Sequence, residues 1–217
     1  MEYAIEVRNL TKRYKGFTLD DISFALPRGT VMGLIGENGA GKSTLINSIL
    51  GIADSESSLT AMLGLDMKTH SKKIKEDIAV IFNDSHYDVN LTPKIIGHIL
   101  SKVYKNWDAP LFSEYLERFG LPEKKKIKKL STGMRVKLEF AAALSHHPKL
   151  LILDEATSGL DPVFRNEILD ILREFTEDED HAVLMSSHIT SDLDKIADYI
   201  AYLHEGKMQF IKTYDEI

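Results

Sequence analysis

Apolar and polar residues follow patterns along the chain that predict two kinds of β-strand. Residues 2–8 and 17–26 alternate between apolar and polar positions, which is typical of antiparallel strands with one face in water. Other runs are apolar almost throughout, as parallel strands buried on both faces are. These runs cover residues 31–35, 78–82, 149–155 and 182–187. Residues 59–65 predict a short strand, and 196–203 predict the end of a helix and the final strand.

Helices are predicted between these strands. The helix after the first buried run is expected to end at Gly51. Residues 92–120 predict further helices, and prolines and glycines separate them. Ser131 is a natural N-cap, while Asp161 and Pro162 suit the N-cap and first turn of a later helix.

The order of these elements predicts an α/β fold in one domain. The α/β core, which includes an N-terminal antiparallel β-subdomain, is expected over residues 1–83 and 148–217. An inserted α-helical subdomain is expected over about residues 84–147. A chain of 217 residues is long enough to bury such a core.

Composition narrows the classes of function. The chain has 27 Lys and Arg against 33 Asp and Glu, and its net charge of −6 disfavours a general polyanion binder. It has no cysteine, which excludes disulfides and thiolate zinc sites and fits a reducing compartment. The N-terminus has no apolar signal segment, and no apolar run approaches the ~18 residues that a membrane-spanning helix needs. Work at a membrane would therefore require recruitment by a partner.

Residues 36–44 (GENGAGKST) satisfy the phosphate-binding pattern G-x-x-x-x-G-K-[ST] between a buried strand and a helix. Glycines let successive backbone amides point toward phosphate oxygens, with the positive end of the helix dipole behind them. Lys42 supplies a charge for the β- and γ-phosphates, and Ser43 supplies a hydroxyl for Mg²⁺. The predicted nucleotide-binding residues of this loop are Gly36, Glu37, Asn38, Gly39, Ala40, Gly41, Lys42, Ser43 and Thr44.

The buried run at 149–155 ends in two carboxylates, which is the Walker B pattern. Asp154 is placed to orient Mg²⁺, and Glu155 could polarise a water for attack on the γ-phosphate. His188 follows another buried run at the same predicted sheet edge, where it could hydrogen-bond the γ-phosphate. With the phosphate-binding loop, these residues predict nucleotide hydrolysis.

Other features have two interpretations from the local sequence. Tyr14, in the basic turn 12–16, is either a half-buried loop aromatic, which the local sequence favours, or a stacking platform for a base. The basic run 123–129 is either a solvated face, the more frequent case, or a contact surface for an acidic partner or a phosphate backbone. Ser131 caps a helix and could also mark an anion site. The histidines at 146–147 fit a structural role at a helix end, because no metal-ligand spacing accompanies them.

The order of the motifs resembles the ATPase domain of ATP-binding cassette (ABC) proteins along essentially the whole chain. The motifs are 36–44, Asn83, 130–134 (LSTGM), 150–155 (LLILDE), 158–161 (SGLD) and His188. The resemblance implies a P-loop NTPase core of the RecA-like type, with ATP and Mg²⁺ as its cofactors. It also implies a head-to-tail dimer, in which the signature loop of one copy covers the ATP held by the other.

The resemblance also assigns roles to single residues. Tyr14 becomes the adenine-stacking aromatic, which reverses the local preference, and Asn83 belongs to the loop that touches Mg²⁺ and the transport partner. Glu155 becomes the catalytic carboxylate and His188 the switch histidine. The further nucleotide contacts that it implies are Ser131, Gly133, Met134 and Asp161.

Three positions depart from the family pattern. Thr132 replaces the first signature glycine, Met134 replaces the usual glutamine, and Asn83 replaces a glutamine that is one methylene longer. The signature serine and second glycine remain, so we expect an active site in which Asn83 could reach Mg²⁺ through a water. With the short single-domain chain, these variants look most like ATPase subunits of bacterial exporters whose membrane subunit is a separate chain.

The resemblance therefore implies the ATP-hydrolysing subunit of an ABC exporter, with peptides or antimicrobial agents as the expected substrates. It implies a peripheral position on the cytoplasmic face of the membrane, as a dimer with itself or a paralogue, and no nucleic acid partner. The alternative is a soluble ABC ATPase that acts on nucleic acid or ribosomes, but such proteins usually carry two cassettes or a long coiled-coil insertion. A non-hydrolysing sensor is disfavoured because Lys42, Asp154, Glu155 and His188 are all present.

Overall fold

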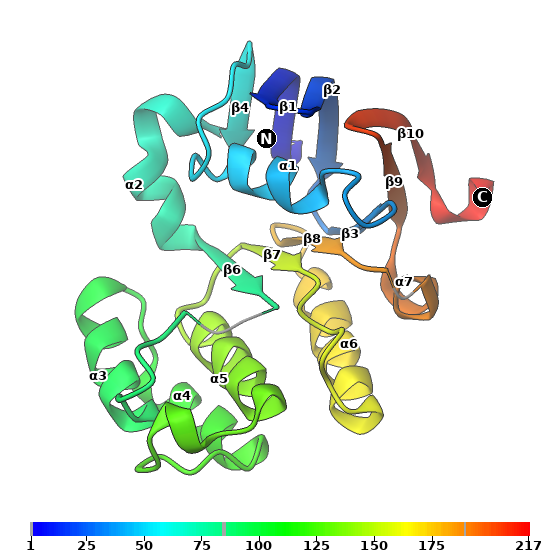
Figure 1. The fold of residues 1–217 in the computed structure, drawn as a ribbon. Helices are drawn as coiled ribbons and strands as arrows, with labels where there is room; N and C mark the ends of the chain where they lie inside the picture. The colour runs from blue at the N-terminus through cyan, green and yellow to red at the C-terminus, as the bar shows by residue number, and fades with distance from the viewer. Residues whose placement is uncertain (1, 84–85, 189) are drawn as a thin grey trace.

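Two β-sheets with helices packed around them make up the described part of the chain (Figure 1). The computed structural model describes residues 2–83, 86–188 and 190–217. Within these ranges no helix is both long and apolar enough to cross a bilayer. The arrangement is of the α/β class that the sequence predicts.

The smaller sheet is antiparallel, with the strand order β2-β1-β4-β5. Its strands are β1 Tyr3–Tyr14, β2 Phe17–Pro27, β4 Leu59–Met62 and β5 Leu65–Asp66. The expected basic turn at 12–16 is wrong in extent, because β1 continues to Tyr14 and only Lys15 and Gly16 form the turn. The single strand expected at 59–65 is split into β4 and β5, because Leu63 and Gly64 adopt positive φ and reverse the chain.

The larger sheet has the strand order β10-β9-β3-β8-β7-β6. Its strands are β3 Thr30–Ile35, β6 Ile78–Phe82, β7 Leu150–Asp154, β8 Ala182–Ser186, β9 Tyr199–His204 and β10 Lys207–Thr213. The four buried runs are confirmed as parallel strands of this sheet. The expectation that β9 is the final strand is wrong, because β10 follows it and pairs with it antiparallel. β10 is an edge strand whose side chains are exposed or only partly buried, so it lacks a continuous apolar run.

The helices begin and end close to the predicted signals. They are α1 Lys42–Ile49, α2 Met67–Asp77, α3 Pro93–Val103, α4 Ala109–Arg118, α5 Thr132–Leu144, α6 Pro162–Thr176 and α7 Thr190–Ile196, with short 3₁₀ turns at Ile127–Lys129 and Tyr214–Glu216. Gly51 follows α1 with φ of 67°, which confirms the predicted stop. Ser131 and Asp161 are the N-caps of α5 and α6, as predicted. Figure 1 shows α5 and α6 on the face of the larger sheet opposite α1 and the smaller sheet.

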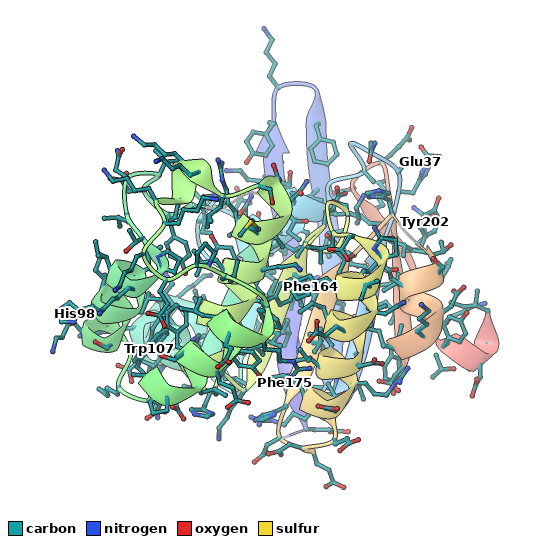
Figure 2. The ribbon with its side chains drawn as sticks, turned by 90° about the horizontal axis from the view of Figure 1, so that it is seen from below. Glu37, His98, Trp107, Phe164, Phe175 and Tyr202 are labelled. Atoms are coloured by element: carbon teal, nitrogen blue, oxygen red, sulfur yellow. The ribbon has the colours of Figure 1, made fainter. Side chains whose placement is uncertain are left out.

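Alternate residues of the buried strands pack into two separate cores. In β7, Leu151 and Leu153 belong to the core with α5 and α6, whereas Leu150 and Ile152 belong to the core with α1 and the smaller sheet. β8 follows the same alternation. Both faces of these strands are therefore covered, which explains their continuous apolar sequences. Figure 2 shows Phe164 of α6 near the middle of the molecule, where it is part of the first core.

Candidate functional site

The carboxyl ends of four parallel strands meet at one edge of the larger sheet, and the candidate residues follow these ends. The register pairs Phe82 of β6 with Asp154 of β7, and it pairs Ser186 of β8 with both Asp154 and Leu34 of β3. Residues in the loops just after these strands therefore lie at the same edge, where ligands of such sheets bind.

The loop between β3 and α1 is held in shape by backbone contacts. The Ala40 N–H donates to the Glu37 carbonyl at 3.0 Å, and the Gly206 N–H donates to the Ala40 carbonyl at 3.0 Å. Gly41, the N-cap of α1, has φ of 109°, and a Cβ added there would lie 2.6 Å from the Phe17 ring. Because Gly41 has no side chain to cap the helix, the first amides of α1 are available to an anion.

Lys42 is almost completely buried beside this loop, with 5% of its surface exposed. Its Nζ donates to the Gly36 carbonyl at 2.8 Å and to the Glu37 carbonyl at 3.3 Å. The Oε1 atom of Glu155 lies 3.7 Å from the same nitrogen. These oxygen atoms hold a buried positive charge at the loop, as a phosphate-binding site requires.

Glu155 turns away from the line of β7 in a left-handed conformation, with φ of 53°. Its N–H donates to the carbonyl of Ser186 at 3.2 Å and to the hydroxyl of Ser186 at 3.0 Å. The same hydroxyl donates to Oδ1 of Asp154 at 2.7 Å. His188 Nδ1 lies 3.7 Å from the Oε2 atom of Glu155. This network holds a backbone conformation that costs roughly 1–2 kcal/mol in a residue with a side chain, and it directs the carboxylate between Lys42 and His188.

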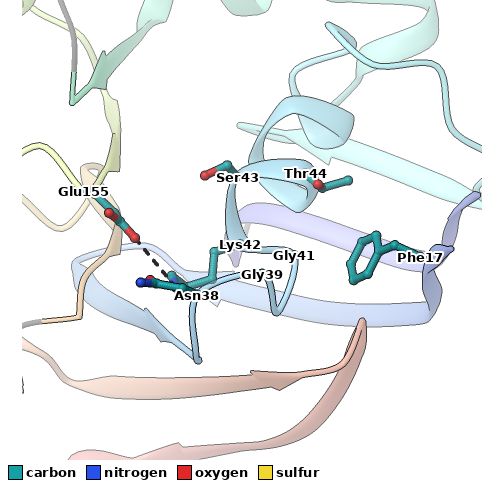
Figure 3. Close-up of a pocket in the computed structure, with 8 residues that line it drawn as sticks. All are labelled: Phe17, Asn38, Gly39, Gly41, Lys42, Ser43, Thr44 and Glu155. Carbon is teal, nitrogen blue, oxygen red and sulfur yellow. Dashed lines mark ion pairs between the residues drawn. The ribbon is translucent and has the colours of Figure 1, made fainter. Parts of the chain in front are cut away.

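Lys42 and Glu155 face a cavity of about 210 Å³, with Glu155 on one side of the loop and Phe17 on the other (Figure 3). The cavity is lined by Phe17, Asn38, Gly39, Gly41, Lys42, Ser43, Thr44 and Glu155. The sequence predicted each of these residues except Phe17. The sequence feature that points to Phe17 is its position directly after Gly16, where it pairs across the hairpin with Tyr14, the aromatic residue that the sequence analysis identified.

Tyr14 lies beside Phe17 but does not line the cavity. It is the cross-strand partner of Phe17 at the end of β1, and it is 50% exposed. The Lys12 ammonium lies 4.9 Å from the centroid of its ring. The stacking role of Tyr14 stays a prediction, and Phe17 is the aromatic that the cavity itself presents.

Ser131, Gly133 and Met134 of the predicted signature lie at the N-terminus of α5, and Asp161 lies at the N-terminus of α6. None of these four residues lines the cavity. Ser131 caps α5, and its Oγ accepts from the Met134 N–H at 3.2 Å. Asp161 caps α6, and its Oδ1 accepts from the Phe164 N–H at 3.0 Å. This bond lowers the pKa of the Asp161 carboxyl, with a smaller contribution from the positive charge of Lys137. Gly133 lies in the first turn of α5.

The oxygen atoms near the loop fit Mg²⁺ that is shared with phosphates. Ser43 lines the cavity, and the buried Asp154 offers a carboxylate at the same sheet edge. Hydroxyl and carboxylate oxygens are the ligands that Mg²⁺ prefers. Among the described residues no group of three or more His, Asp or Glu could hold a metal ion, so phosphate and water oxygens would complete the coordination. Asn83 is exposed directly after β6 and does not line the cavity.

Comparison with known proteins returns matches along most of the chain. A family model described as ABC transporter matches residues 19–158. The bacitracin transport ATP-binding protein BcrA of Enterococcus faecalis is 35% identical over 211 residues, which cover 96% of this chain and 68% of that protein. The lantibiotic transport ATP-binding protein SrtF of Streptococcus pyogenes is 34% identical over 216 residues, which cover 97% and 91%. A solved structure of an ATP binding subunit of an ABC transporter aligns with a TM-score of 0.89 at 25% identity, covering 98% of this chain and 91% of that chain.

Proposed function

This chain belongs to the ABC transporter family of ATP-binding proteins, and we propose that it is the ATP-hydrolysing subunit of an exporter of peptides or antimicrobial agents. Members of the family bind ATP, and they are ATPases coupled to transport. The choice of substrate is supported by the similar proteins that are named for bacitracin and lantibiotic transport. The proposal of ATP hydrolysis rests on one observation: Glu155 lines the cavity and its Oε1 atom lies 3.7 Å from Nζ of the buried Lys42.

We propose the following roles for the residues around the cavity. The first amides of α1 and the Lys42 ammonium bind the phosphates of ATP. Ser43 and Asp154 would hold Mg²⁺, which supplies positive charge to the phosphate oxygens. Glu155 accepts a proton from the attacking water, and Lys42 approaches its Oε1 atom while His188 approaches its Oε2 atom.

The base is proposed to lie at the β1–β2 hairpin. Phe17 offers a ring at the cavity wall, and Tyr14 offers the neighbouring ring on the paired strand. An aromatic face can stack on any planar base. In this arrangement the two rings would bind the base at one end of the cavity, and the loop at 36–44 and Lys42 would bind the phosphates.

A second copy of the chain, or a paralogue, is proposed to complete the site. The signature residues Ser131, Gly133 and Met134, together with Asp161, stand at helix N-termini outside the cavity of their own chain. A helix N-terminus stabilises phosphate charge. Head-to-tail pairing would bring these ends to the ATP of the partner, so that ATP binding favours the closed dimer.

Separate membrane subunits are the proposed transport partners, which would place the chain at the cytoplasmic face of the membrane. Asn83 follows β6 at the proposed start of the helical subdomain, about residues 84–147, and is exposed there. We propose that this loop reports the state of the nucleotide site to the membrane subunits. A nucleic acid partner is not expected, because the net charge is −6.

Affinity purification from membranes tests the transport role. The tagged chain would be isolated from its source organism in mild detergent, in parallel with a tagged Lys42→Ala variant as a nucleotide-site control. We expect a polytopic membrane protein to co-purify with the unmodified chain. Recovery only in the soluble fraction, together with ribosomal proteins or nucleic acid, would overturn the exporter proposal in favour of a soluble ABC ATPase.

A further inference from the structure

The loop that begins at Glu155 is tied twice to the segment that begins at His188. The first tie is the approach of His188 Nδ1 to the carboxylate of Glu155 at 3.7 Å, and of these two residues Glu155 lines the cavity. The second lies deeper, where the Thr157 hydroxyl donates to Oδ2 of Asp192 at 3.0 Å. Thr157 is 1% exposed and Asp192 is 2% exposed. Asp192 belongs to the first turn of α7, so the tie joins the loop to a helix.

Arg165 of α6 completes this buried network. Its Nε donates to the Thr157 carbonyl at 3.3 Å, and its Nη2 donates to the Leu160 carbonyl at 3.1 Å. The same Nε lies 4.0 Å from Oδ2 of Asp192. A carboxylate as buried as Asp192 is costly unless it is hydrogen-bonded and near a positive charge. Thr157 supplies the hydrogen bond and Arg165 the positive charge. Both reach Asp192 only while the loop of Thr157, α6 and α7 keep their relative positions.

We propose that Asp192 is a positioning residue for ATP hydrolysis, and that it acts through Thr157. Its bond to Thr157 fixes the loop of Glu155 against α7, so that Glu155, which lines the cavity, keeps its distance from His188. Neither Thr157 nor Asp192 lines the cavity, so their effect is on the position of the carboxylate. The inference rests on the proposed roles of Glu155 and His188.

The energetic argument depends on how precisely a general base must be placed. Glu155 has to lie within hydrogen-bond reach of the attacking water. The turn at Glu155 has an unfavourable φ, so the loop needs contacts that maintain it. Misplacement of a reacting group by about 1 Å can cost on the order of 100-fold in rate. Loss of one buried tie should therefore lower turnover and leave the phosphate-binding loop intact.

Two substitutions at one position test the role of the Thr157 hydroxyl. Thr157→Val removes the hydroxyl and keeps the shape, whereas Thr157→Ser keeps the hydroxyl and removes a methyl group. We expect Thr157→Val to lower kcat by about 10-fold, while the KM for ATP changes by less than about 2-fold. Thr157→Ser should retain most of the kcat. Thermal unfolding of both variants would show whether they fold as the unmodified chain does.

A double-mutant cycle with Asp192→Ala tests whether the two side chains act as one unit. If Asp192 acts through Thr157, adding Asp192→Ala to Thr157→Val should change kcat by less than about 2-fold. Equal kcat for the Val and Ser variants, or independent effects that multiply in the double variant, would overturn the inference. If kcat, ATP affinity and unfolding temperature all fall together, the network only stabilises the fold, and the inference about Asp192 is wrong.

Glu155→Gln, measured in the same assay, separates this inference from the proposed function. Full turnover by Glu155→Gln would reject Glu155 as the general base, and the proposed hydrolytic roles would fail. Loss of turnover in Glu155→Gln, with normal turnover in Thr157→Val, would reject only the positioning role of Asp192.

Discussion

Removing either aromatic ring at the β1–β2 hairpin should weaken the binding of ATP and spare the binding of inorganic triphosphate. Phe17 lines the cavity, and Tyr14 is its cross-strand partner with half of its surface exposed. Phe17 also contacts the loop at Gly41, whereas Lys42 is paired with Glu155 on the other side of the cavity (Figure 3). A base that stacks on these rings therefore contributes free energy that a triphosphate without a base cannot gain.

The expected size of the effect follows from the energy of stacking. A base on an aromatic side chain contributes ~1–3 kcal/mol by alanine substitution. Tyr14→Ala should then raise the Kd for ATP roughly 5- to 150-fold. At Phe17 leucine is the better substitution, because the ring packs against Gly41 and an alanine would leave a gap beside the loop. Phe17→Leu removes the π-face and keeps most of the apolar contact.

Isothermal titration calorimetry with Mg²⁺-ATP and with Mg²⁺-triphosphate gives the comparison directly. We expect both variants to bind triphosphate as the unmodified chain does and to bind ATP more weakly. Equal losses for the two ligands would refute the stacking argument, because they would indicate damage to the phosphate site. A loss of ATP binding in Phe17→Leu alone would reject the role of Tyr14 and leave Phe17 as the base platform.

Three further predictions concern charge and protonation. Lys42→Ala should weaken ATP binding by roughly 100-fold or more, because a buried cation with charge-assisted hydrogen bonds is lost; near-normal affinity in calorimetry would contradict the phosphate-site assignment. Glu155→Gln should keep ATP affinity and lower kcat by about 10²- to 10⁴-fold, the range for loss of a general base, as measured by phosphate release. Burial lowers the pKa of His146, against the opposing effect of its hydrogen bond to the Ile78 carbonyl, so the folded chain disfavours its protonation. The stability that this neutral histidine provides is therefore present above its unfolded pKa of about 6.5 and is lost as the pH falls; in urea unfolding at pH 7.5 and 5.5, His146→Gln should lose less stability than the unmodified chain, and an equal loss would contradict the argument.

The fold and the phosphate-binding loop could be predicted because their signals are local. A strand covered on both faces must be apolar at every position, and a loop that packs Gly41 against a ring must have glycine there. Each of these constraints acts on consecutive residues. The edge strand β10 was missed because only part of its surface is buried, so its sequence carries a weak pattern.

Phe17 could not be predicted because its role depends on a contact between segments that are far apart in the sequence. Tyr14 and Phe17 are direct cross-strand partners, so their side chains lie on the same face of the sheet. What distinguishes them is the contact of Phe17 with the phosphate-binding loop, where a Cβ added at Gly41 would lie 2.6 Å from its ring. The local sequence therefore indicates an aromatic hairpin but does not determine which of its rings contacts the loop.

The contact between Thr157 and Asp192 lay beyond prediction for a related reason. The two residues are 35 positions apart, on either side of α6 and β8. In the sequence one is a polar residue in a turn and the other is an acid in the first turn of a helix, and both patterns are usually met at solvent-exposed positions. Only the folded chain brings them together in a buried site, where hydroxyl and carboxylate satisfy each other.

The position of Glu155 shows why the site needs so many indirect supports. Glu155 itself adopts a left-handed backbone conformation. The direction of its carboxylate therefore depends on contacts made by the residues before and after this turn. Before the turn, Ser186 bonds the backbone of Glu155 and the side chain of Asp154. After the turn, Thr157 bonds Asp192. Ser186 and Asp192 flank His188 in the chain, so a movement of that segment would reach Glu155 from both sides.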